Sequence, residues 1–137
     1  MKKLLFRLFS LSYLLFLSSC GSSDNQFELI GNADVSDGTM IYVLQADQNN
    51  QPYIKDSTSV ESNSFKFKGV SSTPQISYIQ VEGVNGYVLA ILENGDIKAD
   101  IFKDSISKSR VYGTKSNDDF IKYCLLYTSD AADEKRC

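Results

Sequence analysis

The sequence predicts an all-β domain, either an antiparallel β-sandwich or a barrel-like fold, built from about seven or eight strands. Three observations support this fold class. Short segments that are apolar, or that alternate between apolar and polar residues, follow one another from residue 27 to residue 112. Turn-forming residues separate these segments at intervals of about 8–12 residues. Helical patterns are expected only at the two ends, as an N-terminal signal helix and as the start of a C-terminal helix.

Three strands are predicted in the first part of the domain. The first covers residues 27–30 and ends at Gly31. The second covers residues 40–44, which are apolar on both faces, as in a strand buried between two layers. Residues 47–52 are dense in turn formers and predict a hairpin loop. The third strand follows over residues 53–60, with its serines and threonines on the expected solvent face.

The next strands are predicted from alternation and from one apolar run. Residues 65–68 place two phenylalanine rings inward and two lysines outward. Residues 77–81 form a fifth strand, which a turn at residues 84–86 ends. Residues 87–92 are the most apolar run after the leader, so we expect them to form a central strand.

Two further strands and a helix complete the domain. Asn94-Gly95 is typical of a type I′ hairpin, since both residues tolerate positive φ. Residues 96–101 then alternate, with Ile97, Ala99 and Ile101 facing inward, and residues 110–112 form a short last strand. A helix follows with Ser116 as the expected N-cap. Polar side chains come next, near the positive end of its dipole: Asn117, Asp118 and Asp119.

Residues 1–19 have the organisation of a lipoprotein signal peptide. Basic residues precede an apolar core at residues 8–17, which is shorter than the roughly 20 residues that span a bilayer. Leu17-Ser18-Ser19-Cys20 resembles the bacterial lipobox, in which the cysteine thiol receives a diacylglycerol and becomes the mature N-terminus. Cys20 is therefore the predicted lipidation site. The alternative is an ordinary signal peptide with an incidental cysteine.

Lipidation at Cys20 predicts where the protein resides. Acyl chains contribute about 0.8 kcal/mol per buried methylene, so several chains make a durable anchor in a membrane. Gly21 follows the cysteine, which resembles the outer-membrane sorting pattern. We expect a lipid-anchored protein of the cell envelope, at the outer membrane, that faces either the periplasm or the surface. Residues 20–26 form its polar tether.

Residues 124–134 resemble the translation of a transposase-type sequencing adapter. Residues 124–137 are therefore predicted to be an artefact that truncates the natural chain near Tyr123. The alternative is a genuine tail, apolar and then acidic. The remaining chain divides into the β domain, residues 27–114, and the start of a truncated helix or linker, residues 115–123.

Composition excludes several classes of function. Residues 20–123 carry nine basic and fourteen acidic side chains, a net charge of −5, and no basic run, which argues against a nucleic-acid partner. The chain has no histidine, which removes histidine-dependent nucleophiles and the commonest metal ligand. With Cys20 acylated and Cys124 and Cys137 discounted, no cysteine is left for a disulfide, a zinc site or a redox pair. We therefore predict no catalytic residue, no metal and no cofactor.

Several short stretches resemble a domain of unknown function that is common in exported lipoproteins of Bacteroidetes-type bacteria. The resemblance covers roughly residues 27–123, and its matching stretches are residues 37–43, 56–57 before Val60, 65–69, 91–97 and 111–118. Where that family more often has a glycine-containing turn, this chain has Ser62-Asn63-Ser64; Asn63 can still take positive φ. The resemblance implies an accessory β domain that precedes a thioredoxin-like domain of the TlpA or AhpC/TSA type. The catalytic Cys-x-x-Cys of that domain would lie downstream of Tyr123.

Carboxylates and tyrosines are the remaining candidates for a site. Glu93 and Asp96 flank one predicted hairpin, and Asp96, Asp100 and Asp104 recur at fourfold spacing. A glycosidase needs two carboxylates about 5–9.5 Å apart across a cleft, whereas strand carboxylates are typical of a solvated sheet surface. A calcium loop at Asp47, Asn49 and Asn50 lacks acidic density. Four tyrosines either line a sugar- or peptide-binding face or sit at sheet edges with the ring buried: Tyr42, Tyr53, Tyr78 and Tyr87.

Three functions follow from these observations. The leading hypothesis is a non-catalytic N-terminal accessory domain of a membrane-anchored, thioredoxin-like lipoprotein of the disulfide reductase or peroxiredoxin type. The alternative is a stand-alone, lipid-anchored envelope module that binds a glycan, a peptide or a protein. A carboxylate-based hydrolase is the third hypothesis. The sequence does not name the ligand.

Overall fold

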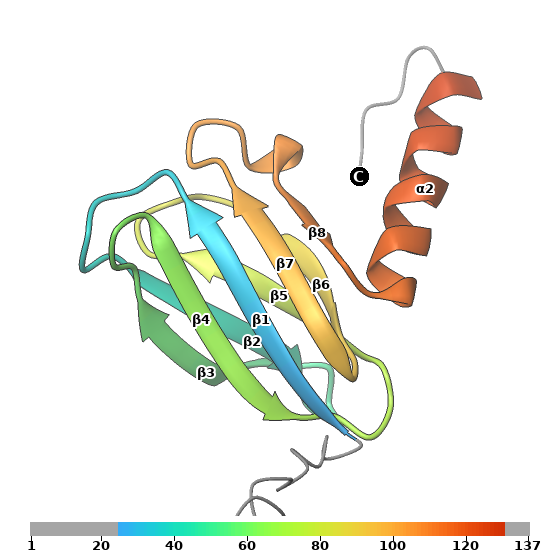
Figure 1. Ribbon diagram of the computed structural model, residues 1–137, viewed down its shortest axis with the longest axis horizontal. Coiled ribbons are helices and arrows are strands. Elements are labelled where there is room, and N and C mark those ends of the chain that lie inside the picture. The colour runs from blue at the N-terminus through green and yellow to red at the C-terminus, as the bar shows by residue number, and fades with distance from the viewer. Residues whose placement is uncertain (1–24, 131–137) are drawn as a thin grey trace, which may run out of the picture.

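The structure, a computed structural model that describes residues 25–130, confirms the predicted all-β fold. Two sheets of four strands each face one another, one helix lies at their side, and no barrel closes within the described residues (Figure 1). The strands are β1 Gln26–Ala33, β2 Met40–Ala46, β3 Pro52–Ser59, β4 Ser64–Val70, β5 Gln75–Val81, β6 Val88–Leu92, β7 Gly95–Ile101 and β8 Arg110–Tyr112. A short 3-10 helix, η2 Ile106–Lys108, precedes β8, and the α-helix is α2 Lys115–Asp130.

The strands divide into sheet A, in the order β4-β1-β7-β8, and sheet B, in the order β3-β2-β5-β6. Five of the six strand pairs are antiparallel, as predicted. The exception is β1 with β7, which run parallel from the Phe27–Gly95 pair to the Ala33–Ile101 pair. Parallel pairing requires a long crossover, and here the crossover is the whole of sheet B together with β4.

The core lies between the sheets and follows the alternation of the strands. Phe65 and Phe67 are 3% exposed and the lysines beside them are exposed, which confirms the predicted orientation of β4. Ile97, Ala99 and Ile101 of β7 are likewise buried. Alternation therefore predicts correctly which side chains fill the space between the sheets.

Two glycines in sheet A give room to two core phenylalanines. Gly31 of β1 pairs with Phe65 of β4, and Gly69 of β4 pairs with Phe27 of β1. A Cβ atom at Gly69 would lie 2.7 Å from the Phe27 ring, and one at Gly31 would collide with the Phe65 ring. Each ring thus covers the backbone of the glycine opposite, which fastens β1 to β4 at two points.

The prediction of a central strand at residues 87–92 is wrong. β6 Val88–Leu92 forms the outer edge of sheet B, with β5 as its one strand neighbour. Its apolar side chains on both faces led to the prediction. On the far side β6 adjoins the start of α2 rather than another strand, as the contacts of Asn117 below show.

The prediction of a type I′ hairpin at Asn94-Gly95 is also wrong. These residues link β6 in sheet B to β7 in sheet A, and positive φ is found at Gly95 (+122°) but not at Asn94. A tight turn of that kind occurs instead at Ser62 and Asn63, whose φ values are +52° and +60°. Glu61 and Ser64 exchange two backbone hydrogen bonds of 2.9 and 3.0 Å across it. The expectation that Asn63 takes positive φ is confirmed.

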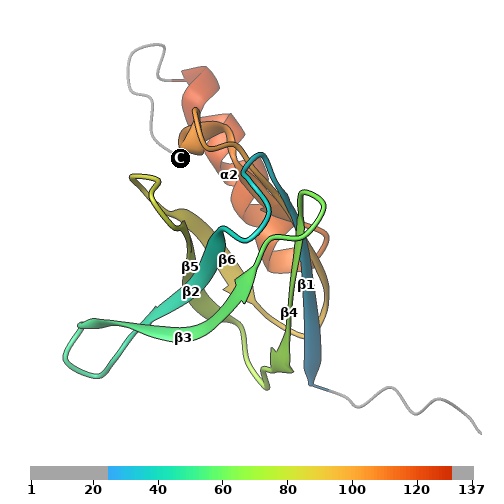
Figure 2. The same ribbon diagram turned by 90° about the vertical axis from the view of Figure 1, so that its left-hand side faces the viewer.

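β3 departs from the predicted pattern because it forms the other edge of sheet B. Residues 52–57 are exposed whichever way they point, and a bulge interrupts the pairing with β2 between Val43 and Leu44. Figure 2 shows the β2–β3 hairpin extending away from sheet A. Part of the inner face of sheet B is therefore not covered by the opposite sheet.

Ser116 is not the N-cap, because the helix starts two residues earlier than predicted. α2 begins at Lys115, and the Asp118 N–H donates to the Thr114 carbonyl over 2.9 Å, so Thr114 occupies the N-cap position. No helix within residues 25–130 is long and apolar enough to cross a membrane. The signal peptide, Cys20 and the first part of the tether lie outside the described residues, as do residues 131–137.

Candidate functional site

Glu93 is placed at the start of α2. Its carboxylate accepts hydrogen bonds from the Ser116 N–H and the Ser116 hydroxyl, each over 2.7 Å. Burial by itself raises the pKa of Glu93. The hydrogen bonds from Ser116 and Thr114, with the charge of Lys115, outweigh burial and hold that pKa below its ordinary value. A carboxylate at a helix N-terminus accepts hydrogen bonds from backbone N–H groups that have no partner within the helix. Because its pKa is lowered, it is also poorly suited to act as a general acid.

The other carboxylates do not gather around Glu93. Asp96 and Asp100 lie on the outer face of sheet A, where Asp100 accepts a 3.5 Å hydrogen bond from Asn32. Burial, and then the neighbouring Asp100, raise the pKa of Tyr112. Asp104 follows β7 in a loop. Among residues 25–130 no three acidic or cysteine side chains come together in a way that could hold a metal ion.

The loop considered for calcium has a structural role. The Asp47 carboxylate accepts hydrogen bonds from the backbone N–H groups of Asn49 and Gln51, each over 2.8 Å. Asn50 adopts positive φ at +63°. These contacts are those of an Asx turn that closes the β2–β3 hairpin.

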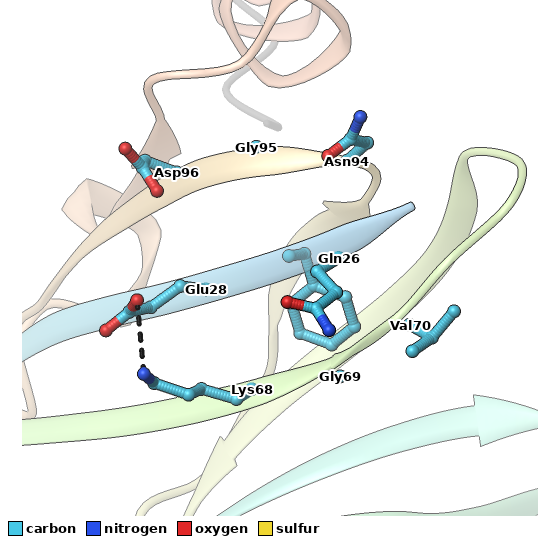
Figure 3. Close-up of a pocket in the computed structure, with 9 residues that line it drawn as sticks. Gln26, Glu28, Lys68, Gly69, Val70, Asn94, Gly95 and Asp96 are labelled. Carbon is cyan, nitrogen blue, oxygen red and sulfur yellow. Dashed lines mark ion pairs between the residues drawn. The ribbon is translucent and has the colours of Figure 1, made fainter. Parts of the chain in front are cut away.

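An open pocket of about 460 Å³ lies where β1 begins, on the outer face of sheet A (Figure 3). Side chains of both charges line it. Glu28 accepts from Lys66 and Lys68 over 2.5 and 3.5 Å, and the hydrogen bond from Lys66 does most to lower the pKa of Glu28. Glu28 and Lys68 already offset one another, and Asp96 is the one further charged side chain in the lining.

The outer faces of the two sheets differ in chemistry. The outer face of sheet A carries seven charged side chains: Glu28, Lys66, Lys68, Asp96, Lys98, Asp100 and Arg110. The outer face of sheet B carries none at its regular strand positions. Nine apolar or aromatic side chains, which we call the apolar face of sheet B, occupy it instead: Met40, Tyr42, Leu44, Ile54, Ile76, Tyr78, Tyr87, Leu89 and Ile91.

Cross-strand pairing makes this apolar face continuous. Leu44 lies between Ile54 of β3 and Tyr78 of β5, and Tyr78 in turn pairs with Leu89 of β6. Ile76 is 61% exposed, although its neighbours in the core, Ser77 and Ile79, are completely buried. Contiguous exposed apolar surfaces of this kind are typical of interaction sites in proteins.

Three of the four predicted tyrosines lie on the apolar face. Tyr78 and Tyr87 are exposed and meet edge to face, with ring centroids 6.3 Å apart and ring planes at 67°. Tyr42 is half-buried between its neighbours. Tyr53 points to the inner face of sheet B, where its hydroxyl donates to Gln45 over 3.1 Å. The binding-face hypothesis therefore fits Tyr42, Tyr78 and Tyr87, and the buried-ring alternative fits neither Tyr78 nor Tyr87.

The sequence analysis did not predict that the aliphatic residues of the apolar face lie on an outer surface. Residues 40–44 and 87–92 are apolar on both faces, and this pattern indicated strands covered on both sides. The structure covers only the inner side of β2 and β6. Leu44, Leu89 and Ile91 point to the side that the other sheet does not cover. Apolar residues at such positions were the sequence signal for an apolar outer face.

Two residues near the C-terminus have contacts that the sequence did not predict. Asn117 lies in the first turn of α2, near the positive end of the helix dipole as expected, and in addition it is 1% exposed and binds the backbone of β6. Cys124 was discounted, and no disulfide was predicted, yet Cys124 is disulfide-bonded in the structure. α2 also continues through residues 124–130, which the sequence had assigned to an artefact.

The comparisons with known proteins give one result. A family described as a domain of unknown function, DUF4369, matches residues 27–120. Neither the curated proteins nor the solved structures yield a match to this chain. The matched range begins within β1 and ends in the second turn of α2, so it includes both sheets and the start of the helix.

Proposed function

The chain belongs to the DUF4369 family, and we propose that it is a non-catalytic accessory domain of a lipid-anchored envelope protein. The observation that carries this proposal is the apolar face of sheet B, which has no charged side chain at its strand positions. An accessory domain needs a surface that packs against its partner, and exposed apolar area is what drives such packing. The carboxylates, which a hydrolase would require, hold turns and the helix start instead.

The proposed occupant of the apolar face is a thioredoxin-like domain that follows α2 in the natural protein. The resemblance of the sequence to thioredoxin-associated lipoprotein domains supports this choice. The position of α2 also supports it, because Ser116 and Asn117 attach the helix to Glu93 and Ile91, at the strand that bounds the apolar face. A domain tethered at that point has a high effective concentration, of the order of mM, at the face.

The two ends of the domain support a role as a spacer. The tether reaches the domain at Gln26, one residue before the Phe27–Gly95 pair, at the end of sheet A where β1 begins. In both views α2 runs away from that end (Figures 1 and 2). With diacylglycerol on Cys20, the domain would therefore hold the partner away from the outer membrane.

The first test is to read the gene from genomic DNA beyond the codon for Tyr123. We expect a Cys-x-x-Cys at the start of a helix, within a βαβ pattern. A stop codon shortly after Tyr123 would rule out the thioredoxin-like partner and would favour the stand-alone binding module.

A second test examines the apolar face in the full-length protein. Tyr78 and Tyr87 should resist nitration when the partner covers them, while Tyr53 on the inner face serves as the internal reference. Ile76→Glu should restore their reactivity because it places a charge in the contact. Ile30→Glu is the matched control, since Ile30 is also an exposed strand isoleucine but lies on sheet A. Equal reactivity of Tyr78 and Tyr87 in all three proteins would contradict the proposed contact.

The membrane anchor has its own test. Cys20→Ser removes the thiol that would carry the diacylglycerol, so the protein should move from the membrane fraction to the soluble fraction. Protein that remains on the membrane after this change would show that another segment holds it there.

The second candidate function is a stand-alone envelope module that binds a glycan, a peptide or a protein. The exposed Tyr78–Tyr87 pair favours it, because tyrosine rings with free hydroxyl groups are common at binding surfaces. In that case Tyr78 and Tyr87 would be protected by the added ligand and not by a domain of the same chain.

A further inference from the structure

A small cleft opens between the sheets, where β3 and β4 diverge. We call it the β3–β4 cleft; its volume is about 90 Å³, roughly that of three water molecules in the liquid. Its floor is apolar and consists of Phe27, Val43, Phe67 and Leu92, each no more than 6% exposed. A space of this size with an apolar floor accommodates a short branched aliphatic group.

A polar network borders the cleft on the uncovered inner face of sheet B. Gln45, which is 9% exposed, donates to Ser77 over 2.9 Å and to Gln75 over 3.1 Å, and it accepts from Tyr53. The Lys55 ammonium donates to the same Gln75 oxygen over 3.1 Å. Through Gln75, the Lys55 ammonium is linked to a network of side chains from three strands, next to the cleft that Lys55 also lines.

The charge at the mouth of the cleft is not neutralised on the Lys55 side. Within residues 25–130 no carboxylate lies within ion-pair distance of Lys55, whose hydrogen-bond partner is a neutral amide. Lys68 also lines the cleft, but it pairs with Glu28 over 3.5 Å. Asp56 is the one acidic side chain at the rim, and it accepts a 2.8 Å hydrogen bond from the Ser57 N–H.

We propose that the β3–β4 cleft binds a short aliphatic carboxylate. The branched chain occupies the floor formed by Val43, Phe67 and Leu92, and the carboxylate accepts a charge-assisted hydrogen bond from Lys55. Two sources share this chemistry: a peptide C-terminus that ends in leucine or valine, and a free short-chain fatty acid. The hydrogen bond to Gln75 directs the Lys55 ammonium toward the inner face of sheet B, where the cleft opens.

The test uses amide NMR spectra of the exported chain, with Cys20→Ser to keep it in solution. Three probes are added separately: 3-methylbutanoate for the fatty acid, N-acetyl-leucine for the peptide C-terminus, and 3-methylbutanamide as the neutral analogue. At least one carboxylate should shift the resonances of Val43, Lys55 and Leu92 in a saturable way, while the amide should bind about tenfold more weakly or not at all. The carboxylate that binds more tightly identifies the source.

Variants separate a specific site from weak adsorption. Lys55→Met keeps the length of the side chain but removes the charge and should weaken carboxylate binding about tenfold. Lys103→Met, an exposed lysine in the loop after β7, is the matched control and should leave binding unchanged. Asp56→Asn should tighten binding, because it removes the one acidic group at the rim. Failure of both carboxylates to bind, equal binding of the amide, or equal affinity of the Lys55→Met and Lys103→Met variants would overturn the proposal.

Discussion

A single amide side chain, that of Asn117, satisfies the backbone N–H and carbonyl of Ile91 at the outer edge of sheet B. The Ile91 N–H donates to the Asn117 Oδ1 over 2.9 Å, and the Asn117 Nδ2 donates to the Ile91 carbonyl and to the Thr114 hydroxyl, each over 2.8 Å. The Asn117 amide thus makes the same two hydrogen bonds to the Ile91 backbone that a residue of a neighbouring strand would make. Edge strands left open invite pairing with other chains, and this contact prevents it at Ile91.

Replacement of Asn117 by alanine should destabilise the fold. The change removes three hydrogen bonds and leaves the Ile91 backbone groups without partners, at a cost of about 2–4 kcal/mol. Urea unfolding measures the loss. Asp119→Ala, which removes only an exposed pair with Lys115, should change the stability little. A similar stability for both variants would show that the amide does not hold the helix on the sheet.

The stability of the domain should depend on the ionisation of Glu93. Its pKa in the folded state is lower than its ordinary value, so the stabilisation is present above that ordinary value, about 4.5, and is lost as the pH falls through the lower folded-state pKa. The difference in unfolding free energy between the native protein and Glu93→Gln should therefore shrink as the pH falls from about 7 to about 3. Glu61→Gln, at an exposed turn, is the control. A difference that stays constant with pH would contradict this account.

At the scale of elements, β1 and β4 are joined by two reciprocal contacts between glycine and phenylalanine. Gly31→Ala and Gly69→Ala should each cost about 1–3 kcal/mol, because the new methyl group meets the Phe65 or the Phe27 ring. A smaller side chain at Phe65 should relieve the first clash, so Gly31→Ala with Phe65→Leu should cost less than the sum of the two single changes. Thermal unfolding of the four proteins gives the coupling. Strict additivity would mean that the ring and the glycine do not interact.

Strands were predictable from the sequence, but their places in the sheets were not. Alternation places Phe65, Phe67 and Ile97 in the core correctly, because side chains in a strand point to opposite faces in turn. Alternation is a local property and says nothing about which strand is the neighbour. For that reason Asn94-Gly95 was interpreted as a hairpin, although the chain passes there from one sheet to the other.

The candidate site was predicted in part for the same reason. Tyrosines on a sheet were expected, and Tyr78 and Tyr87 do lie together on one exposed face. Gln45, Lys55 and Gln75, in contrast, come together only through the pairing of three strands and the bulge in β3. No spacing in the sequence indicates that contact.

At the scale of the whole molecule, the two parts of α2 on either side of Tyr123 should contribute differently. Ser116 and Asn117, before the predicted truncation at Tyr123, make the side-chain hydrogen bonds to residues 91 and 93 that anchor the start of α2. A chain that ends at Tyr123 should therefore keep its strand signal in circular dichroism. It should unfold at a lower urea concentration than the full chain, because it lacks Cys124, which is buried and disulfide-bonded. Loss of cooperative unfolding in this shortened chain would show that the end of α2 is part of the folding unit.

The sequence by itself determined the β class and the inward side of most strands, because both depend on residues close together in the chain. The leader that ends at Cys20 stays a prediction from the same kind of local pattern. Only the tertiary structure decided that β1 and β7 run parallel, that β6 is an edge closed by Asn117, and that Glu93 holds a helix. It also decided that one outer face is charged and the other apolar. These features depend on which distant segments become neighbours, and the burial of the whole chain selects those neighbours.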